Sequence, residues 1–300
     1  MTMHQGHETS HDIHFMKMVL EHKEHEGRFI TFMTSKGIDR ITPTQDGASF
    51  QDEHTAPAAQ RPQYSLTHLI LLHLLPGVLI VLFAIIVGPM VISAGLPLLL
   101  VPSLWVLCVL IPFELGYLLY QGKRRNGRLS LHGIVLYRES VSVKLYVLLI
   151  PALLVWGVLA FLVTQPIEPY LIKTLFFWMP GWFLSLFAAN TTGGHPPTVL
   201  LLTVLLYMFT NPAAAFVEEL YFRGYLLPRM AHLKGGAPLL NTVLFSLQHL
   251  FSPWQNPGRI LAFLPVAYTV AWKKNIFVGI ITHCLLDVLS ASLLLVMLYH

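Results

Sequence analysis

The segment PAAAFVEELYFRGYLLPRM, residues 212–230, places Glu218, Glu219 and Arg223 inside an otherwise apolar stretch. The whole chain has 300 residues, of which 55% are hydrophobic and 11% are charged, and its mean hydropathy is +0.62. Soluble domains carry roughly 25% charged residues, so this composition points to a lipid environment. A membrane helix needs about 20 mostly apolar residues, which residues 212–230 nearly provide.

Similar apolar segments before and after this one predict an all-α, polytopic transmembrane helical bundle with eight to nine membrane segments. The candidate segments are Leu66–Ser93, Leu96–Tyr120, Val143–Val163, Tyr170–Phe187, Thr198–Thr210, Pro212–Met230, Pro238–Phe251, Ile260–Trp272 and Ile276–Tyr299. Thr198–Thr210 is too short to span comfortably, and Asn211-Pro212 could form a kink or a tight turn. Residues 127–140 could form an interfacial amphipathic helix.

Composition divides the chain into three predicted parts. Residues 1–62 hold nine of the fifteen acidic residues and seven of the fifteen histidines, and we expect a mobile, cytoplasmic, His-rich tail there. Residues 63–190 are predicted to be variable N-terminal transmembrane helices, and residues 191–300 carry the charged membrane segments. Cys108 and Cys284 both lie in apolar runs, which argues against a disulfide framework.

Eight of the thirteen basic residues after residue 62 fall in three clusters. They lie at residues 123–128, at Arg229 and Lys234, and at Lys273 and Lys274. With nine spans and a cytoplasmic N-terminus, all three clusters would face the cytoplasm, as the positive-inside rule requires, and Arg259 would be the exception. Because this rule and anionic lipid explain the positive charge, the bilayer is the expected partner and nucleic acid is not.

The adjacent carboxylates of Glu218 and Glu219 would each be costly in lipid unless paired or hydrated. Glu219 and Arg223 are four residues apart, so they share a helix face and can form an ion pair. Glu218 points about 100° away from Glu219 and is left without this partner. A carboxylate in such a position suits general-base chemistry. The alternative is that both glutamates only hold neighbouring helices together by hydrogen bonds.

Two later segments add ionisable side chains. LFSLQHLF carries His249, with Phe245 one turn earlier on the same face, and GIITHCLLDVLS carries His283 and Asp287 four residues apart. Each could be a structural hydrogen-bonding residue. Together with the glutamates they could activate a water and stabilise an oxyanion. They could also relay protons in a transporter, or bind a divalent metal such as zinc through Glu218, His249 and His283.

The three patterns together resemble the CPBP family (CAAX protease and bacteriocin-processing, also called Abi). The patterns are Glu218-Glu219-x-x-x-Arg223, Phe245-x-x-x-His249 and His283-x-x-x-Asp287, in this order on successive apolar segments. The resemblance covers about residues 195–295. It implies intramembrane hydrolysis of peptide bonds in membrane-associated peptides or proteins, by a helical bundle whose cavity opens to membrane and cytoplasm. A carrier, or a non-catalytic scaffold or immunity member of the family, is the alternative.

The resemblance also implies a role for each residue. Glu218 and His249 would activate the water, His283 and Asp287 would stabilise the oxyanion, and Glu219 with Arg223 would brace the site. Prenyl-protein processing members often end the last motif in Asn, whereas Asp is common in bacterial relatives, which implies a bacterial plasma membrane. An ionised Asp cannot donate a hydrogen bond. Asp287 would therefore be protonated, orient His283 or bind metal, and the label metalloprotease stays open.

The tail also contains His7-Glu8-Thr9-Ser10-His11, which matches the HExxH pattern of zinc proteases. That pattern needs a packed helix, a third ligand and a substrate cleft, and this polar terminal context supplies none of them. We interpret it as a decoy. Adventitious or regulatory metal binding by the tail histidines is the more credible function.

Overall fold

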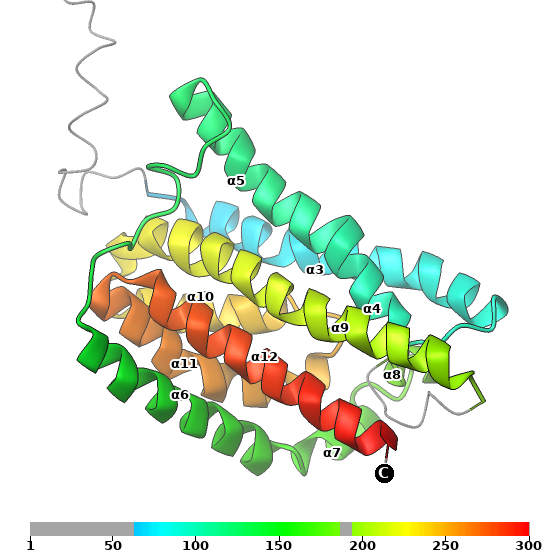
Figure 1. The fold of residues 1–300 in the computed structure, drawn as a ribbon. Coiled ribbons are helices and arrows are strands. Elements are labelled where there is room, and N and C mark those ends of the chain that lie inside the picture. Colours follow the sequence, from blue (N-terminus) through cyan, green and yellow to red (C-terminus); the bar gives the residue numbers. More distant parts are fainter. Residues whose placement is uncertain (1–62, 187–193, 300) are drawn as a thin grey trace, which may run out of the picture. The chain divides into compact units, whose positions relative to one another are not determined.

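The computed structural model describes residues 63–186 and 194–299, and within these ranges the regular elements are helices (Figure 1). The α-helices are α3 Leu66–Ser93, α4 Leu100–Trp105, α5 Ile111–Asn126, α6 Val143–Thr164, α7 Ile167–Thr174, α8 Gly181–Leu184, α9 Pro197–Glu218, α10 Gly236–Leu247, α11 Asn256–Lys273 and α12 Ile276–Tyr299. A π-helical turn at Val106–Leu110 joins α4 to α5. The predicted all-helical class is confirmed.

Five stretches of the described residues are long and apolar enough to cross a membrane. They are Leu66–Ser93, Leu100–Asn126, Val143–Thr164, Pro197–Leu233 and Ile276–Val296. Only 22–39% of the most apolar part of each stretch is buried within the protein, so most of each surface presents apolar side chains outward. Such an outward-facing apolar surface is suited to lipid. The two remaining long helices, α10 and α11, pack against each other among these spans, and the predicted count of eight to nine membrane segments is not confirmed.

The predicted span Tyr170–Phe187 is wrong. The chain there forms two short helices, α7 and α8, and the residues between Thr174 and Gly181 are turns. Pro180 disfavours helical backbone at Met179 and cannot donate a helical hydrogen bond itself. The aromatic run therefore covers one end of the bundle instead of crossing the membrane.

The predicted segments Thr198–Thr210 and Pro212–Met230 are not separate, and no tight turn forms at Asn211-Pro212. Residues 197–233 form one continuous helical stretch with Pro212 inside α9. Membrane helices tolerate proline because neighbouring groups satisfy the freed backbone. The stretch changes to a π-helix over Glu219–Leu226 and to a 3₁₀ helix over Leu227–Leu233. A π segment inside a helix is rare and is frequently found at functional sites.

The predicted interfacial helix at residues 127–140 does not form. Gly127 ends α5 in the left-handed region with φ 69°, and Gly133 and Tyr137 also have positive φ values. The segment instead bonds to other elements through its backbone, because the amide of Leu136 donates to the carbonyl of Gly224 at 2.8 Å. This hydrogen bond holds residues 127–140 against the outer side of the π-helical segment.

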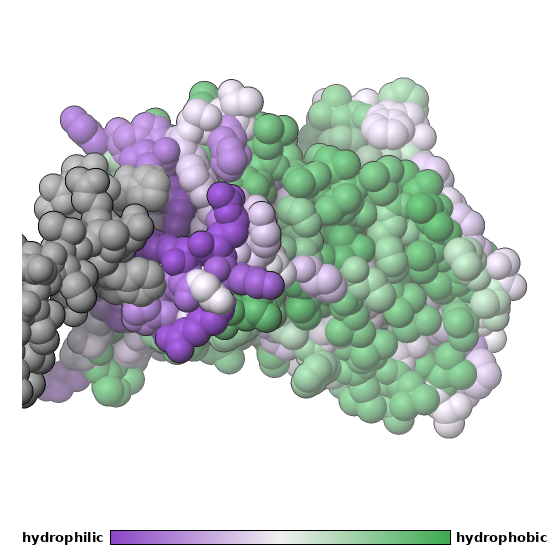
Figure 2. Space-filling model, turned by 90° about the horizontal axis from the view of Figure 1, so that it is seen from above, coloured by the Kyte–Doolittle hydropathy of each residue, from purple (hydrophilic) through white to green (hydrophobic). Residues whose placement is uncertain are grey.

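The three basic clusters predicted to share one side of the membrane do lie at one end of the helices (Figure 1). α5 ends there, α9 continues to it through Leu233, and α11 ends there immediately before α12 begins. Lys274 pairs with Glu139 at 3.4 Å, and Arg229 donates to the carbonyl of Ile134, which ties the clusters together. Figure 2 shows hydrophilic residues gathered toward this end and hydrophobic residues over the remainder of the visible face. We call it the basic end.

Candidate active site

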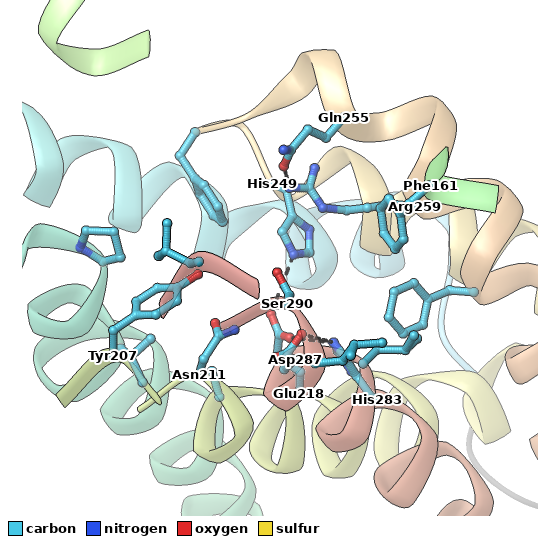
Figure 3. Close-up of a pocket in the computed structure, with 18 of the residues that line it drawn as sticks. Phe161, Tyr207, Asn211, Glu218, His249, Gln255, Arg259, His283, Asp287 and Ser290 are labelled. Carbon is cyan, nitrogen blue, oxygen red and sulfur yellow. Dashed lines mark hydrogen bonds and ion pairs between the residues drawn. The ribbon is translucent and has the colours of Figure 1, made fainter. Parts of the chain in front are cut away.

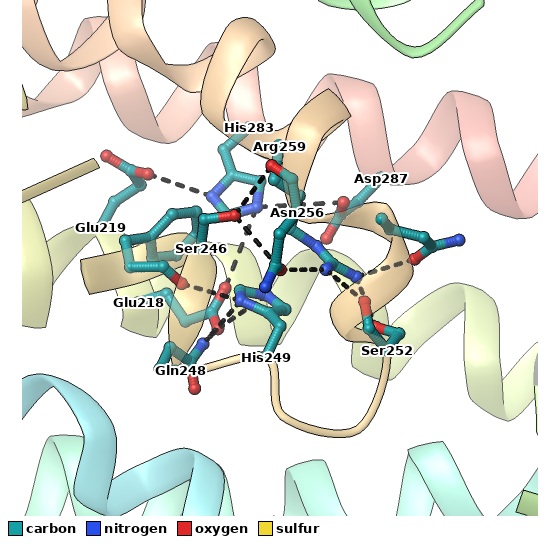
Figure 4. Close-up of polar contacts among 12 residues, drawn as sticks. Glu218, Glu219, Ser246, Gln248, His249, Ser252, Asn256, Arg259, His283 and Asp287 are labelled. Carbon is teal, nitrogen blue, oxygen red and sulfur yellow. Dashed lines mark hydrogen bonds and ion pairs between the residues drawn. The ribbon is translucent and has the colours of Figure 1, made fainter. Parts of the chain in front are cut away.

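The six ionisable residues singled out in the sequence come together in one network, and Figure 4 labels all of them except Arg223. Glu218 ends α9, and Glu219 and Arg223 follow it in the π-helical segment. His283 and Asp287 lie one turn apart on α12, which packs along α9. His249 lies just beyond α10 rather than within it, because the helix ends at Leu247.

Glu218 is the centre of this network. Its Oε1 accepts a hydrogen bond from Gln248 Nε2 at 3.1 Å and lies 3.9 Å from His249 Nε2. Its Oε2 lies 3.9 Å from His283 Nε2. Both imidazole distances exceed the length of a direct hydrogen bond. A small molecule such as water, hydrogen-bonded to both partners, fits between groups at this separation.

The tautomer of His249 follows from its backbone contact. His249 Nδ1 lies 2.9 Å from the carbonyl oxygen of Phe245, one helical turn earlier. Nδ1 also lies 3.2 Å from the Gln248 side-chain nitrogen, which only donates. We assign the proton to Nδ1 on the shorter contact, because a carbonyl oxygen only accepts hydrogen bonds. In the neutral ring the lone pair is therefore on Nε2, the nitrogen that faces Glu218.

Glu219 has a different environment from Glu218. Its Oε1 lies 3.3 Å from Arg223 Nη1 and 3.0 Å from His283 Nδ1, and the side chains of Glu219 and Arg223 are completely buried. The expected ion pair between Glu219 and Arg223 is thus present. The bond to His283 was not anticipated from the sequence, which suggested Asp287 as the residue that orients this ring. It directs the other ring nitrogen, Nε2, toward Glu218.

Phe245 explains why an aromatic residue stands one turn before His249. The Arg223 guanidinium carbon lies 3.8 Å from the centre of the Phe245 ring, a close cation–π contact. The same ring meets His249 edge-on, with ring centres 5.0 Å apart. Phe245 therefore packs the buried cation against the imidazole and fixes both.

Asp287 is the most exposed member of the set, with 24% of its side chain accessible. Its Oδ1 lies 4.0 Å from His283 Nε2, so this ring nitrogen faces two carboxylates, those of Asp287 and Glu218. These neighbours stabilise a positive charge on the imidazole. The structure thus places Asp287 beside His283, at the side of the network nearest to open space.

The proposed metal ligands Glu218, His249 and His283 do not form a compact ligand set. Among the described residues, no group of three or more His, Cys, Asp and Glu side chains is arranged to hold a metal ion. The chemistry below is therefore derived from the side chains alone.

The network borders a cavity of about 590 Å³ (Figure 3). Glu218, His249, His283 and Asp287 all line it, whereas Glu219 and Arg223 are fully buried behind its wall. Much of the remaining wall is apolar, with side chains from α4, α6, α9 and α12. The arrangement therefore separates four residues that can touch a ligand from two that support them.

Two polar residues of this site were missed in the sequence. Gln248 is fully buried and bonds to Glu218, although it stands directly before the singled-out His249. Arg259 lines the cavity and is held by neutral acceptors: its Nη2 bonds to Ser252 Oγ at 2.6 Å and to Gln255 Oε1 at 2.7 Å. Its position outside the three basic clusters was the signal that could have identified it.

Glu168 on α7 lies at the outer part of the cavity wall. Burial raises the pKa of its carboxyl, while a hydrogen bond from Gln255 and the charge of Arg259 oppose this change. Arg259 thus interacts electrostatically with Glu168 and bonds to Ser252, in the loop that follows His249.

Comparison with known proteins supports the motif-based resemblance. No curated protein and no solved structure matches the chain. The family model described as type II CAAX prenyl endopeptidase Rce1-like matches residues 197–289, which include α9, α10, α11 and most of α12. This range contains all three motifs and all six network residues. Over residues 197–289, the chain is therefore similar to the Rce1-like type II CAAX prenyl endopeptidases, as expected of a CPBP-type membrane protease.

Proposed function

We propose that this protein is an intramembrane endopeptidase that hydrolyses peptide bonds through a water activated by Glu218 and His249. The observation that carries the proposal is the geometry of this pair. The His249 Nε2 lone pair and the Glu218 carboxylate face each other across 3.9 Å at the cavity wall. Two acceptors at this spacing can hold one water and remove its proton as it attacks a carbonyl carbon.

His283, Glu219 and Asp287 support the attack of this water by stabilising the oxyanion that it creates. As water attacks, the carbonyl oxygen gains negative charge, which hydrogen-bond donors must stabilise. His283 donates from Nε2 when its ring is protonated, and Glu219 and Asp287 favour that state by their negative charge. Asp287 thus acts through His283 without donating a hydrogen bond itself. The proton taken from water then passes to the leaving amine as the peptide bond breaks.

Glu219 and Arg223 have a positioning role in this scheme. Arg223 neutralises Glu219, and Glu219 fixes the His283 ring by its 3.0 Å bond. A buried carboxylate without such partners would cost several kcal/mol. The pair therefore keeps an oriented imidazole in an apolar interior and takes no part in bond making.

The cellular setting follows from the same features. The candidate spans and the family match indicate an integral membrane protein. We infer that the basic end faces the cytoplasm of a bacterial plasma membrane, which also places the tail of residues 1–62 there. The substrate is a membrane-associated peptide or protein, and clustering of the polar groups at one apolar-walled cavity favours a hydrolase over a carrier.

The proposal is tested by comparing membrane fractions from cells that make the wild type, Glu218→Ala or His249→Ala, using quantitative proteomics. Peptides produced only by the wild type identify the substrates, and the purified enzyme then cleaves them. Glu139→Gln is the control, because this carboxylate is 62% exposed in a surface ion pair far from the cavity. Wild-type cleavage rates in purified Glu218→Ala or His249→Ala would exclude this mechanism.

A further inference from the structure

We propose that Tyr207, Asn211 and Ser290 form a subsite that binds the main chain of the substrate beside the bond to be cleaved. We call these three residues the neutral subsite, because none of their side chains carries a charge. The inference rests on the proposed proteolytic function and adds to it the residues that hold the peptide. Three features support it: the position of the three residues, their lack of hydrogen-bonding partners among the described residues, and the apolar character of the surrounding wall.

The neutral subsite lines the same cavity as the proposed catalytic residues. Asn211 precedes Glu218 by seven residues on α9, so the two side chains share a helix face and lie two turns apart. Tyr207 lies one turn farther along this face. Ser290 follows Asp287 by three residues on α12, which places it on the adjoining turn of the same face. Figure 3 shows Asn211 between Tyr207 and the carboxylates of Glu218 and Asp287.

The packing of α9 against α12 brings the three residues to one part of the cavity. The two helices run in opposite directions, since α9 continues to the basic end and α12 begins there (Figure 1). Cys284 Sγ on α12 donates to the carbonyl of Pro212 on α9 at 3.3 Å, which fixes their alignment. Later turns of α12 therefore lie beside earlier turns of α9, and Tyr207 interacts electrostatically with Asp287. The neutral subsite thus adjoins the Asp287 side of the network.

The side-chain amide of Asn211 differs from those of the other asparagines. Of the five asparagines among the described residues, four bond to other residues of the protein through their side chains: Asn126, Asn241, Asn256 and Asn275. Asn211 lines the cavity and makes no side-chain hydrogen bond to another described residue. A polar group that leaves water needs a hydrogen-bonding partner. When a peptide displaces water from the cavity, the Asn211 amide is therefore free to bond with it.

The two hydroxyl groups of the neutral subsite are also uncommitted. Hydroxyl side chains in helices can bond to the carbonyl group four residues earlier. Within the described spans this bond is made by Thr164, Thr203, Thr210 and Ser292. Ser290 makes no such bond, and the Tyr207 hydroxyl has no partner among the described residues. Three neighbouring groups at the cavity wall thus have free hydrogen-bonding capacity.

The apolar wall explains why the ligand is a peptide main chain. An extended peptide carries N–H and C=O groups that no helix has satisfied, and leaving them unbonded in an apolar environment is costly. Much of the wall consists of apolar side chains that cannot hydrogen-bond, such as Val106, Leu110 and Leu289. The Asn211 amide both donates and accepts, as a peptide group does. Because main-chain bonds give affinity without reading side chains, this subsite leaves the substrate sequence largely open.

Binding of a defined peptide tests the neutral subsite without requiring proteolysis. The probe is an uncharged peptide of alternating leucine and alanine, capped at both ends and carrying a diazirine for photocrosslinking. In a Glu218→Ala background, which blocks cleavage, adding Asn211→Ala should weaken binding about tenfold, as expected for the loss of one or two hydrogen bonds. Thr203→Val on the same helix is the control, because the Thr203 hydroxyl bonds to its own helix backbone. Unchanged binding after Asn211→Ala would overturn the proposal.

An ester analogue of this peptide shows whether the main chain is the group that is bound. Replacing main-chain amides by esters removes N–H donors and keeps every side chain. We expect the Glu218→Ala protein to bind the ester less tightly than the amide. Asn211→Ala should then weaken binding of the ester less than binding of the amide, because the two changes remove a shared interaction. Strictly additive losses would show that Asn211 does not contact the main chain, and would overturn the proposal.

Thermal unfolding in detergent separates substrate binding from a structural role. Asn211→Ala should leave the melting temperature unchanged. Asn241→Ala should lower it, because Asn241 bonds to His73 and to the carbonyl of Phe222 in the buried core. A similar loss of stability in both variants would assign Asn211 to the fold and overturn the subsite.

Cleavage assays distinguish a failure of this inference from a failure of the proposed function. On the substrate found by proteomics, Asn211→Ala and Ser290→Ala should each lower kcat/KM, the former about tenfold. Ser292→Ala is the control, because its hydroxyl bonds to the carbonyl of Val288. Cleavage by Asn211→Ala at the wild-type rate would overturn the subsite and leave the proteolytic function intact. Peptide binding that depends on Asn211, without cleavage of any peptide by the wild type, would refute the proteolytic function and preserve the subsite.

Discussion

Gly77 of α3 packs directly against the backbone carbonyl of Gln248, so closely that a Cβ atom at this glycine would lie 1.7 Å from the carbonyl oxygen. Gln248 in turn donates to Glu218. α3 lies outside the range matched by the family model, which begins at residue 197. The N-terminal helix α3 therefore helps to position Gln248 beside Glu218, although it carries none of the three motifs.

Gly77→Ala is accordingly expected to impair catalysis strongly. The added methyl group cannot fit without moving backbone, because its nearest neighbours are the carbonyl and Cα atoms of Gln248. Overpacking of this kind costs about 1–3 kcal/mol or more. Gly116→Ala is the matched control, since nothing lies within 4 Å of the added atom. Equal cleavage rates and melting temperatures for the two purified variants would contradict the close approach.

Glu219→Gln should destabilise the protein more than Glu218→Gln. Removing the charge of Glu219 leaves Arg223 as an uncompensated buried cation, a change that typically costs about 3–5 kcal/mol. Glu218 instead lines the cavity, beside the Gln248 amide and two imidazoles. Thermal unfolding in detergent measures both variants, and cleavage assays follow activity in parallel. Identical melting temperatures would contradict the assignment of Glu219, and not Glu218, as the residue that neutralises Arg223.

Arg259→Lys should reduce the cleavage rate about tenfold or more. The guanidinium bonds to Ser252, Gln255 and Asn256 together, and thereby fixes the loop that follows His249. Lysine keeps the charge but cannot reproduce this forked geometry. The loss of one charged hydrogen bond, about 1.5–3 kcal/mol, corresponds to this effect on rate. Arg138→Lys, at an exposed position, is the control and should leave the rate unchanged.

The double variant His7→Ala/His11→Ala should cleave substrate at the wild-type rate. This prediction concerns the HExxH pattern of the tail, which lies outside the described residues. If the catalytic residues are those of the membrane network, the tail histidines take no part in bond cleavage. The purified double variant is assayed beside Glu218→Ala. An inactive double variant beside an active Glu218→Ala variant would instead indicate a zinc site in the tail.

The sequence predicted the composition of this site better than its connections. Residues at helical spacing, such as Glu219 with Arg223, are neighbours because of local geometry alone. The bond between Glu219 and His283 joins residues 64 positions apart. It depends on how α12 packs against the π-helical segment, and Gly279 makes room for it: a Cβ there would lie 2.5 Å from Glu219 Oε2. The sequence of a single segment does not determine such packing.

The same limit applies to the fold. α3 was predicted with the bounds that the structure shows, because its 28 residues are uniformly apolar. Two of the errors arose at prolines. Pro212 was treated as a possible break but lies inside α9, and Pro180 was treated as part of a span but separates two short helices. Hydropathy detects lipid exposure, whereas tertiary contacts decide which proline ends a helix.

The turn of the chain after α10 has a consequence for where substrates are cut. α10 has 12 residues and is about 18 Å long, so the loop that carries His249 reaches only partway through a hydrocarbon core about 30 Å thick. An extended chain covers half of such a core in four to five residues, at about 3.3 Å each. We therefore expect unrelated substrate segments to be cleaved at similar distances from the membrane surface.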